Sequence, residues 1–326
     1  MIVDCAVYKE GGREDGQPGL HEAWEQSQAD GSFVWIGLVE PDQAELDEVG
    51  RAFGLHELAI EDAVNAHQRP KLEHYGDSLF MVLKPARFLA ADKRVEVGEI
   101  LLFLGEHFLV SVRHGAASEL SGVRNMIESR PDLMKLGPSS ALHGILDKVV
   151  DDYRSVVTDL EQQIAEEVEA EVLLPNGNCS PERIYTLKRE VLELHMATQP
   201  LLDPLERLSQ GRVGLIDRGI EKYVRDVHDH LVKVVHDQHR CRELLANAMD
   251  LYLSSTSARL NTRVGQLTLV ASIFLPLTFL TGFFGMNFAF LINKITSPLA
   301  FGIGLLVMLA AVAAELVIFK VSGFFN

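Results

Sequence analysis

Small and oxygen-bearing side chains recur at alternating steps of four and three residues in a segment toward the C-terminal end of the chain. Starting from Asp250, the series contains Ser254, Ser257, Asn261, Val264, Thr268, Ala271, Leu275, Thr278 and Gly282. A seven-residue repeat is the period of one face of a supercoiled helix. Hydroxyl and amide oxygens on such a face suit a hydrated hard cation such as Mg²⁺, because this ion gives up its water reluctantly.

We expect this face to line a pore between several copies of the helix. The predicted lining consists of Asn261, Val264, Thr268, Ala271, Leu275, Thr278 and Gly282. Val264 and Leu275 are apolar, so either could close the pore by excluding water. The alternative is helix packing with no pore, because small residues also bring membrane helices together.

Two uncharged runs place this segment in a membrane. No charged residue occurs in 264–293 or in 295–314, and each run is long enough to cross a hydrocarbon core of roughly 30 Å. The cationic residues that flank or separate the two runs are Arg259, Arg263, Lys294 and Lys320. Because only Lys294 lies between the runs, the positive-inside rule predicts that both chain ends are cytoplasmic. The predicted location is the plasma membrane, the inner membrane of a bacterial-type cell.

The rest of the chain must position this helix. Up to about residue 142, β-rich runs such as SFVWIGLVE and HFLVSVRHG alternate with helical patterns, which predicts an α/β domain. Long amphipathic helices follow. One is expected from Pro181 to about Arg207. The last has no glycine from Ile220 until Gly265 and would extend about 65 residues, or about 100 Å, to a Gly-Met-Asn turn.

The predicted fold class is an α+β cytoplasmic domain followed by all-α stalk helices and a two-helix transmembrane hairpin. The predicted boundaries are 1–142 for the cytoplasmic domain, 143–263 for the stalk, 264–287 for the first span, 288–297 for the external loop, 298–319 for the second span and 320–326 for a cytoplasmic tail.

Composition argues against several other classes of protein. The formal net charge is −16, which disfavours binding to nucleic acid. Cys5, Cys179 and Cys241 are far apart, which argues against a disulfide framework or a structural zinc site. The N-terminal residues lack the pattern of a signal peptide. No nucleophile–base pair, phosphate-binding glycine loop or HExxH motif occurs, so we do not expect an enzyme.

The segment FLPLTFLTGFFGMNF resembles the first transmembrane segment and the Gly-Met-Asn signature of the CorA family of divalent cation channels. Further similar segments occur in the family's order: HQRPKLE, LDKVVDDY, YVRDVHDH and MDLYLSSTS. The resemblance implies a homopentamer in a lipid bilayer. It also implies that Asn287 forms an outer selectivity ring for hydrated Mg²⁺, with Gly285 and Met286 shaping the turn.

The resemblance further implies regulation by cytoplasmic Mg²⁺ bound between subunits. Asp62 and Asp250 match the binding pair, with Glu61, Asp147 and Asp226 as supporting acids. Carboxylates on adjacent subunits repel each other unless a divalent cation lies between them. Loss of Mg²⁺ would therefore loosen the stalks and open the pore, provided that the ion binds the closed state better.

The loop between the spans departs from the family pattern. It reads FAFLINKITSP, with no acid and with Lys294, so a ring of lysines would repel cations at low ionic strength. Mg²⁺ is the expected ion, with Co²⁺, Ni²⁺ and Zn²⁺ as further candidates. Two alternatives remain: a zinc transporter of the same superfamily, with or without coupling to protons, and a membrane-anchored Mg²⁺ sensor or scaffold that has lost transport.

Two other groups of residues leave alternatives open. Glu315 near the end of the second span is either a functional acid within the membrane or a side chain that extends to the interface. The histidines of HDHLVKVVHDQH are His228, His230, His236 and His239. They fit either a solvated stalk face or a weakly specified zinc site.

Overall fold

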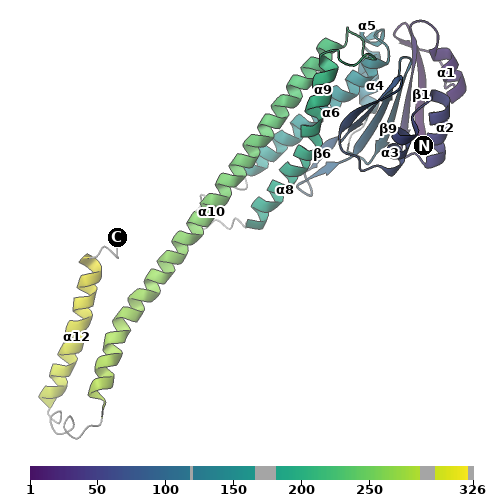
Figure 1. Cartoon of the computed structure of the whole chain (residues 1–326). Helices are drawn as coiled ribbons and strands as arrows, with labels where there is room; N and C mark the ends of the chain where they lie inside the picture. The colour runs from purple at the N-terminus through teal and green to yellow at the C-terminus, as the bar shows by residue number, and fades with distance from the viewer. Residues whose placement is uncertain (118–119, 166–180, 287–297, 322–326) are drawn as a thin grey trace. The chain divides into compact units, whose positions relative to one another are not determined.

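The computed structural model describes residues 1–117, 120–165, 181–286 and 298–321 (Figure 1). The chain divides into two compact units, Met1–Met249 and Asp250–Asn326. The first unit contains a mixed sheet covered by helices. The second contains the end of a long helix and one further apolar helix.

A seven-stranded sheet organises the first unit, in the order β2-β1-β3-β9-β8-β5-β4. The strands are β1 (Ile2–Lys9), β2 (Gly12–Arg13), β3 (Ser32–Val39), β4 (Lys71–Tyr75), β5 (Ser78–Leu83), β8 (Glu99–Leu104) and β9 (Phe108–His114). Only the β3–β9 pair is parallel among these described strands. A separate two-stranded ladder joins β6 (Ala86–Leu89) to β7 (Arg94–Val97).

Helices cover both faces of this sheet. On one face, α1 (Leu20–Ser27), α2 (Gln43–Phe53) and α3 (Glu57–Asn65) pack their apolar sides on Val34, Ile36 and Leu38 of β3 and on neighbouring strands. On the other face, α6 (Pro138–Gln163) contacts β3, β8 and β9. Alternation along β3 explains this division, because successive side chains point to opposite faces of a sheet.

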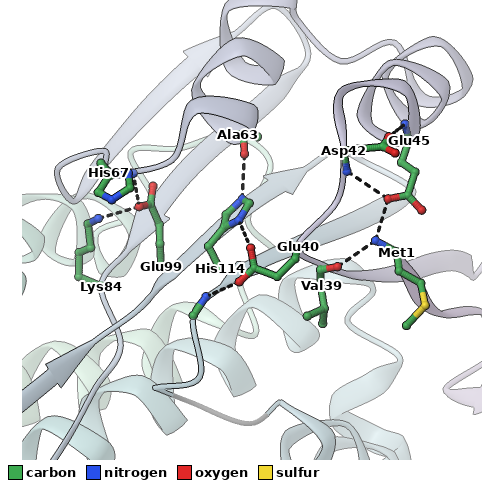
Figure 2. Close-up of polar contacts among 11 residues, drawn as sticks. Met1, Val39, Glu40, Asp42, Glu45, Ala63, His67, Lys84, Glu99 and His114 are labelled. Atoms are coloured by element: carbon green, nitrogen blue, oxygen red, sulfur yellow. Dashed lines mark hydrogen bonds and ion pairs between the residues drawn. The ribbon is translucent and has the colours of Figure 1, made fainter.

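Local sequence signals set the bounds of the helices. Asp42 and Glu45 form a reciprocal capping box at the start of α2 (Figure 2), and Gly54 ends the helix at φ 65°, a left-handed conformation that favours glycine. Pro138 occupies the first turn of α6, where its missing N–H costs no hydrogen bond.

The other helices are α4 (Ser121–Glu128), α5 (Pro131–Met134), α8 (Pro181–Thr198) and α9 (Leu202–Ser209), with a 3-10 turn at Gln199–Leu201. The single helix expected from Pro181 to about Arg207 is thus two helices. Pro200 lies in the intervening turn, and proline cannot donate the hydrogen bond that would continue an α-helix.

The long final helix of the prediction is confirmed. Helix α10 extends without interruption from Glu221 to Phe284, 64 residues, with Pro276 inside it. In the second unit the chain returns along α12 (Pro298–Val321) in the opposite direction (Figure 1). Both helices are long and apolar enough to cross a membrane, and their most apolar windows bury none of their residues within the chain. The apolar side chains of these helices are therefore left exposed by the described part of the chain.

Candidate functional site

The predicted pore lining forms one continuous face of α10. Its seven residues, Asn261, Val264, Thr268, Ala271, Leu275, Thr278 and Gly282, are all exposed within the single chain. Two of its apolar members, Val264 and Leu275, have exposed fractions of 59% and 73%. Nothing in the described part of the chain covers this face, so it is available to line a pore between copies.

The threonine hydroxyls on this face have a defined orientation. Thr268 donates its Oγ1 hydrogen to the carbonyl of Val264 at 2.8 Å, and Thr278 donates to the carbonyl of Phe274 at 2.7 Å. A hydroxyl that has used its proton in this way still offers oxygen lone pairs as acceptors. Such oxygens can accept hydrogen bonds from the water shell of a cation without removing that shell.

In the apolar part of α10, from Val264 to Phe284, the partly covered residues lie on the opposite side of the helix from the stripe. They are Gly265, Leu269, Ser272, Ile273, Pro276, Leu277 and Leu280. At 100° per residue, their mean direction is about 140° away from the stripe. The predicted pore lining and the partly covered residues therefore lie on distinct faces of α10.

The turn that ends α10 is described only in part. Gly285 donates its N–H to the carbonyl of Thr281 at 2.9 Å, and Met286 donates to that of Phe283 at 3.3 Å. Asn287 and the loop 288–297, with Lys294, lie outside the described residues. The predicted selectivity ring therefore stays a prediction.

Asp62 is already paired within its own chain. It lies on α3, where its carboxylate accepts a hydrogen bond from Lys71 Nζ at 2.8 Å. Lys71 also lies 2.6 Å from Glu73. Although burial acts to lower the pKa of Lys71, the two carboxylates outweigh it and raise that pKa. A metal ion at Asp62 must therefore compete with a firmly protonated lysine, a partner that the spacing of the motif HQRPKLE does not reveal.

Asp147 and Asp226 are brought close enough to interact across α6 and α10. Burial is the main cause that raises the pKa of Asp147, and the negative charges of Asp151 and Asp226 raise it further. Positive charge on His143 or His230 acts in the opposite direction. Holding Asp147 ionised thus costs free energy that a divalent cation would offset.

His143 adds a polar atom to this neighbourhood that sequence reasoning did not single out. It lies one helical turn before Asp147 on α6 and is 6% exposed. Its Nδ1 has no hydrogen-bond partner among the residues that the structure describes. Burial lowers its pKa. The apolar spacing on α6 could have marked it as an inward position.

The predicted acids are not assembled into a metal site in one chain. Within the described residues, no group of three or more His, Cys, Asp or Glu side chains is arranged to hold a metal ion. Glu61 is exposed, and Asp62 is not among the groups that act on Asp147. Asp250, also exposed, begins the second unit. Within the described part of one chain, these acids therefore do not converge on a single point.

The family described as CorA-like Mg²⁺ transporter protein matches residues 30–320 of the chain. The chain belongs to this family. It is 31% identical over 260 residues to the cobalt/magnesium transport protein CorA of Thermotoga maritima, covering 79% of this chain and 74% of that protein. The family is one of membrane-integral transporters, in agreement with the two candidate spans.

The fold of the family extends over the whole chain. The complete structure of the CorA magnesium transporter from Methanocaldococcus jannaschii matches with a TM-score of 0.80 at 18% identity, covering 99% of both chains. A zinc transport protein, ZntB of Yersinia pseudotuberculosis, is 23% identical over 243 residues, 72% of this chain and 70% of that protein. The predicted fold class is confirmed, while these comparisons leave the roles of individual site residues open.

Proposed function

We propose that this protein is a homopentameric channel through which hydrated divalent cations, Mg²⁺ first and then Co²⁺ or Ni²⁺, enter the cytoplasm. The observation that carries the proposal is the bare face of α10, where hydroxyl oxygens alternate with Val264 and Leu275 in a helix long enough to cross a membrane. A ring of such faces would guide a hydrated ion, and its apolar levels would close by excluding water. Both chain ends would lie in the cytoplasm, at the inner face of the plasma membrane.

Accessibility of the pore face to a water-soluble thiol reagent tests this proposal. We expect the reagent to block Mg²⁺ entry in Thr278→Cys and to leave it unchanged in Phe279→Cys, which points about 100° away on the same helix. Mg²⁺ entry is measured with a dye in liposomes at an inside-negative potential. Equal block of the two variants, or no Mg²⁺ entry at all, would contradict the proposal.

The native cysteines favour this design. Burial raises the pKa of Cys5 to about 11 and that of Cys241 to about 12, so both remain unreactive thiols at neutral pH. Cys179 lies outside the described residues and is replaced by serine in every variant. The unmodified Cys179→Ser protein serves as the background for both measurements.

We further propose that cytoplasmic Mg²⁺ closes the channel by binding between subunits at Asp62 and Asp250, with Glu61, Asp147 and Asp226 in support. The support is electrostatic. Burial and acidic neighbours raise the pKa of Asp147, and a shared cation would relieve the repulsion between these carboxylates.

The double variant Asp62→Ala with Asp250→Ala should conduct at internal Mg²⁺ concentrations that close the native channel. The matched control is Asp229→Ala, an exposed acid on the same helix as Asp250. Unchanged inhibition in the double variant would refute the assignment.

Transport of Zn²⁺ is the second candidate function. The zinc transport protein among the relatives favours it. A proton-coupled zinc carrier would show Zn²⁺ entry that follows an imposed pH gradient, whereas a channel follows the membrane potential. Zn²⁺ entry into the same liposomes, measured once under a pH gradient alone and once under a membrane potential alone, distinguishes the carrier from the channel.

A further inference from the structure

Three contacts hold the C-terminal end of α3, the helix that bears Glu61 and Asp62 (Figure 2). The carbonyl of Ala63 lies 2.9 Å from Nε2 of His114. The next turn of chain, at Ala66 and His67, has positive φ angles of 49° and 61°, which non-glycine residues adopt at a cost. Glu99 stabilises this turn, because its carboxylate accepts hydrogen bonds from the N–H groups of His67, at 2.7 Å, and Gln68, at 3.2 Å.

His114 is held between two hydrogen-bond acceptors. Its Nε2 faces the carbonyl of Ala63, and its Nδ1 faces the carboxylate of Glu40 at 3.0 Å (Figure 2). A neutral imidazole has one N–H, and only the protonated ring has two. Both contacts can therefore be hydrogen bonds only when His114 carries a proton on each nitrogen.

The Glu40 carboxylate beside His114 is held by a second donor. Glu40 accepts the N–H of Gly115 at 2.7 Å; this bond is the main cause that lowers the pKa of Glu40, and the bond to His114 adds to it. The carboxylate is thus ionised beside the ring. A cation at the C-terminal end of α3 also interacts favourably with the helix dipole.

The ring reaches solvent through an open cavity of about 1050 Å³ in the first unit. Its lining includes His114 and the other charged or titratable groups that face it, namely Glu40, His67, Arg69, Lys84, Arg94, Glu96, Glu99 and Glu193. Arg113 precedes His114 on β9 and acts on the same carboxylate of Glu40. Several of these groups are paired with each other, for example Lys84 with Glu99 at 2.6 Å. Protons therefore have a path to His114, whose side chain is 13% exposed.

We propose that His114 is a positioning residue whose proton fixes the last turn of α3, and through it Glu61 and Asp62. When the ring loses one proton, the remaining N–H goes to Nδ1, because a hydrogen bond to a carboxylate is stronger than one to a neutral carbonyl. Nε2 then turns a lone pair toward the Ala63 carbonyl, and that contact becomes repulsive. The end of α3 loosens and Mg²⁺ binds less well there, a consequence that rests on the proposed regulation.

Hydrogen exchange of the intact protein tests the positioning directly. Peptides covering 57–66 are compared at about pH 5.5 and about pH 8.5, on either side of the range in which histidines usually change charge, after correction for the intrinsic pH dependence of exchange. We expect exchange of the native peptide to be about threefold to tenfold faster at the higher pH, the ratio for the net contribution of one hydrogen bond.

Two variants separate a proton-dependent role from a structural one. In Glu40→Gln, the amide can donate to a neutral His114, so the bond to Ala63 survives and the pH effect disappears. In His114→Arg, the guanidinium donates at both pH values, which again removes the pH effect. His107→Gln, in the turn between β8 and β9, should keep the native difference. A native peptide insensitive to pH, or a pH effect retained in Glu40→Gln and His114→Arg, would overturn the proposal.

Flux measurements distinguish this inference from the proposed regulation. The internal Mg²⁺ concentration for half-inhibition should rise several-fold between the same two pH values in the native channel and stay constant in Glu40→Gln. If exchange changes as expected but half-inhibition does not, the link from α3 to Mg²⁺ is wrong. If internal Mg²⁺ inhibits no variant at either pH, the proposed regulation fails, and the exchange data still decide the role of His114.

Discussion

The two units of this chain treat their apolar side chains in opposite ways. In the first unit, Trp35, Phe80 and Phe103 are each 1% exposed, buried between the sheet and its helices. In the second, Leu275 and Phe279 on α10 are 73% and 70% exposed, and no residue of α12 is buried. The first unit is stabilised by its own core. The second has two helices that are apolar enough to span a membrane and whose most apolar windows the described part of the chain does not bury.

Replacing one phenylalanine by alanine in each unit should give the largest difference in the free energy of unfolding. The ring centroid of Phe103 on β8 lies 5.0 Å from that of Phe80, with the two rings tilted by 45°. Phe103→Ala should therefore lower the free energy of unfolding of the first unit by about 3–5 kcal/mol. Phe279→Ala in the second unit should leave that value unchanged. Fluorescence of Trp24 and Trp35, the two tryptophans of the chain, reports the first unit during urea unfolding in detergent. Equal losses of unfolding free energy in the two variants would contradict this difference between the units.

A charged residue introduced into α12 tests whether this helix is surrounded by lipid. Leu309 lies near the middle of α12 and is 62% exposed, so Leu309→Arg should cost about 2.5–3.5 kcal/mol of membrane insertion. The fraction of protein retained in membranes after carbonate extraction measures this loss. Leu309→Ala is the control and should be retained like the native protein. Full retention of Leu309→Arg would mean that this face does not contact lipid.

A buried acid in the first unit gives the smallest expected effect. Burial chiefly raises the pKa of Asp147, so the folded state binds its proton more tightly than the unfolded chain. Stability then falls as the pH rises through that raised value. Without Mg²⁺ at neutral pH, Asp147→Asn should raise the melting temperature by about 2 °C, measured by calorimetry. Asp229→Asn, at an exposed acid on α10 that is not among the groups acting on Asp147, should change it little; an equal rise would implicate overall charge instead.

Periodicity in the sequence was enough to predict α10, and it also selects the face that we propose lines a pore. A helix of this length without glycine or proline in its first part has few alternatives, and a seven-residue repeat selects one face by geometry alone. The strands β3 and β9 were equally clear because they are continuous apolar runs. Strand β4 was missed, since its residues Lys71 to Tyr75 are mostly polar and only partly covered at the edge of the sheet.

The candidate regulatory residues depended on tertiary structure instead. The sequence by itself determined the two spans, the long helix and the order of the acidic motifs, because each is encoded in residues close together along the chain. Only the folded chain shows Lys71 paired with Asp62, Asp226 acting on the half-buried Asp147, and His114 placed between Glu40 and Ala63. These partners come from separate elements, and the packing of sheet and helices decides which charges meet and at what depth.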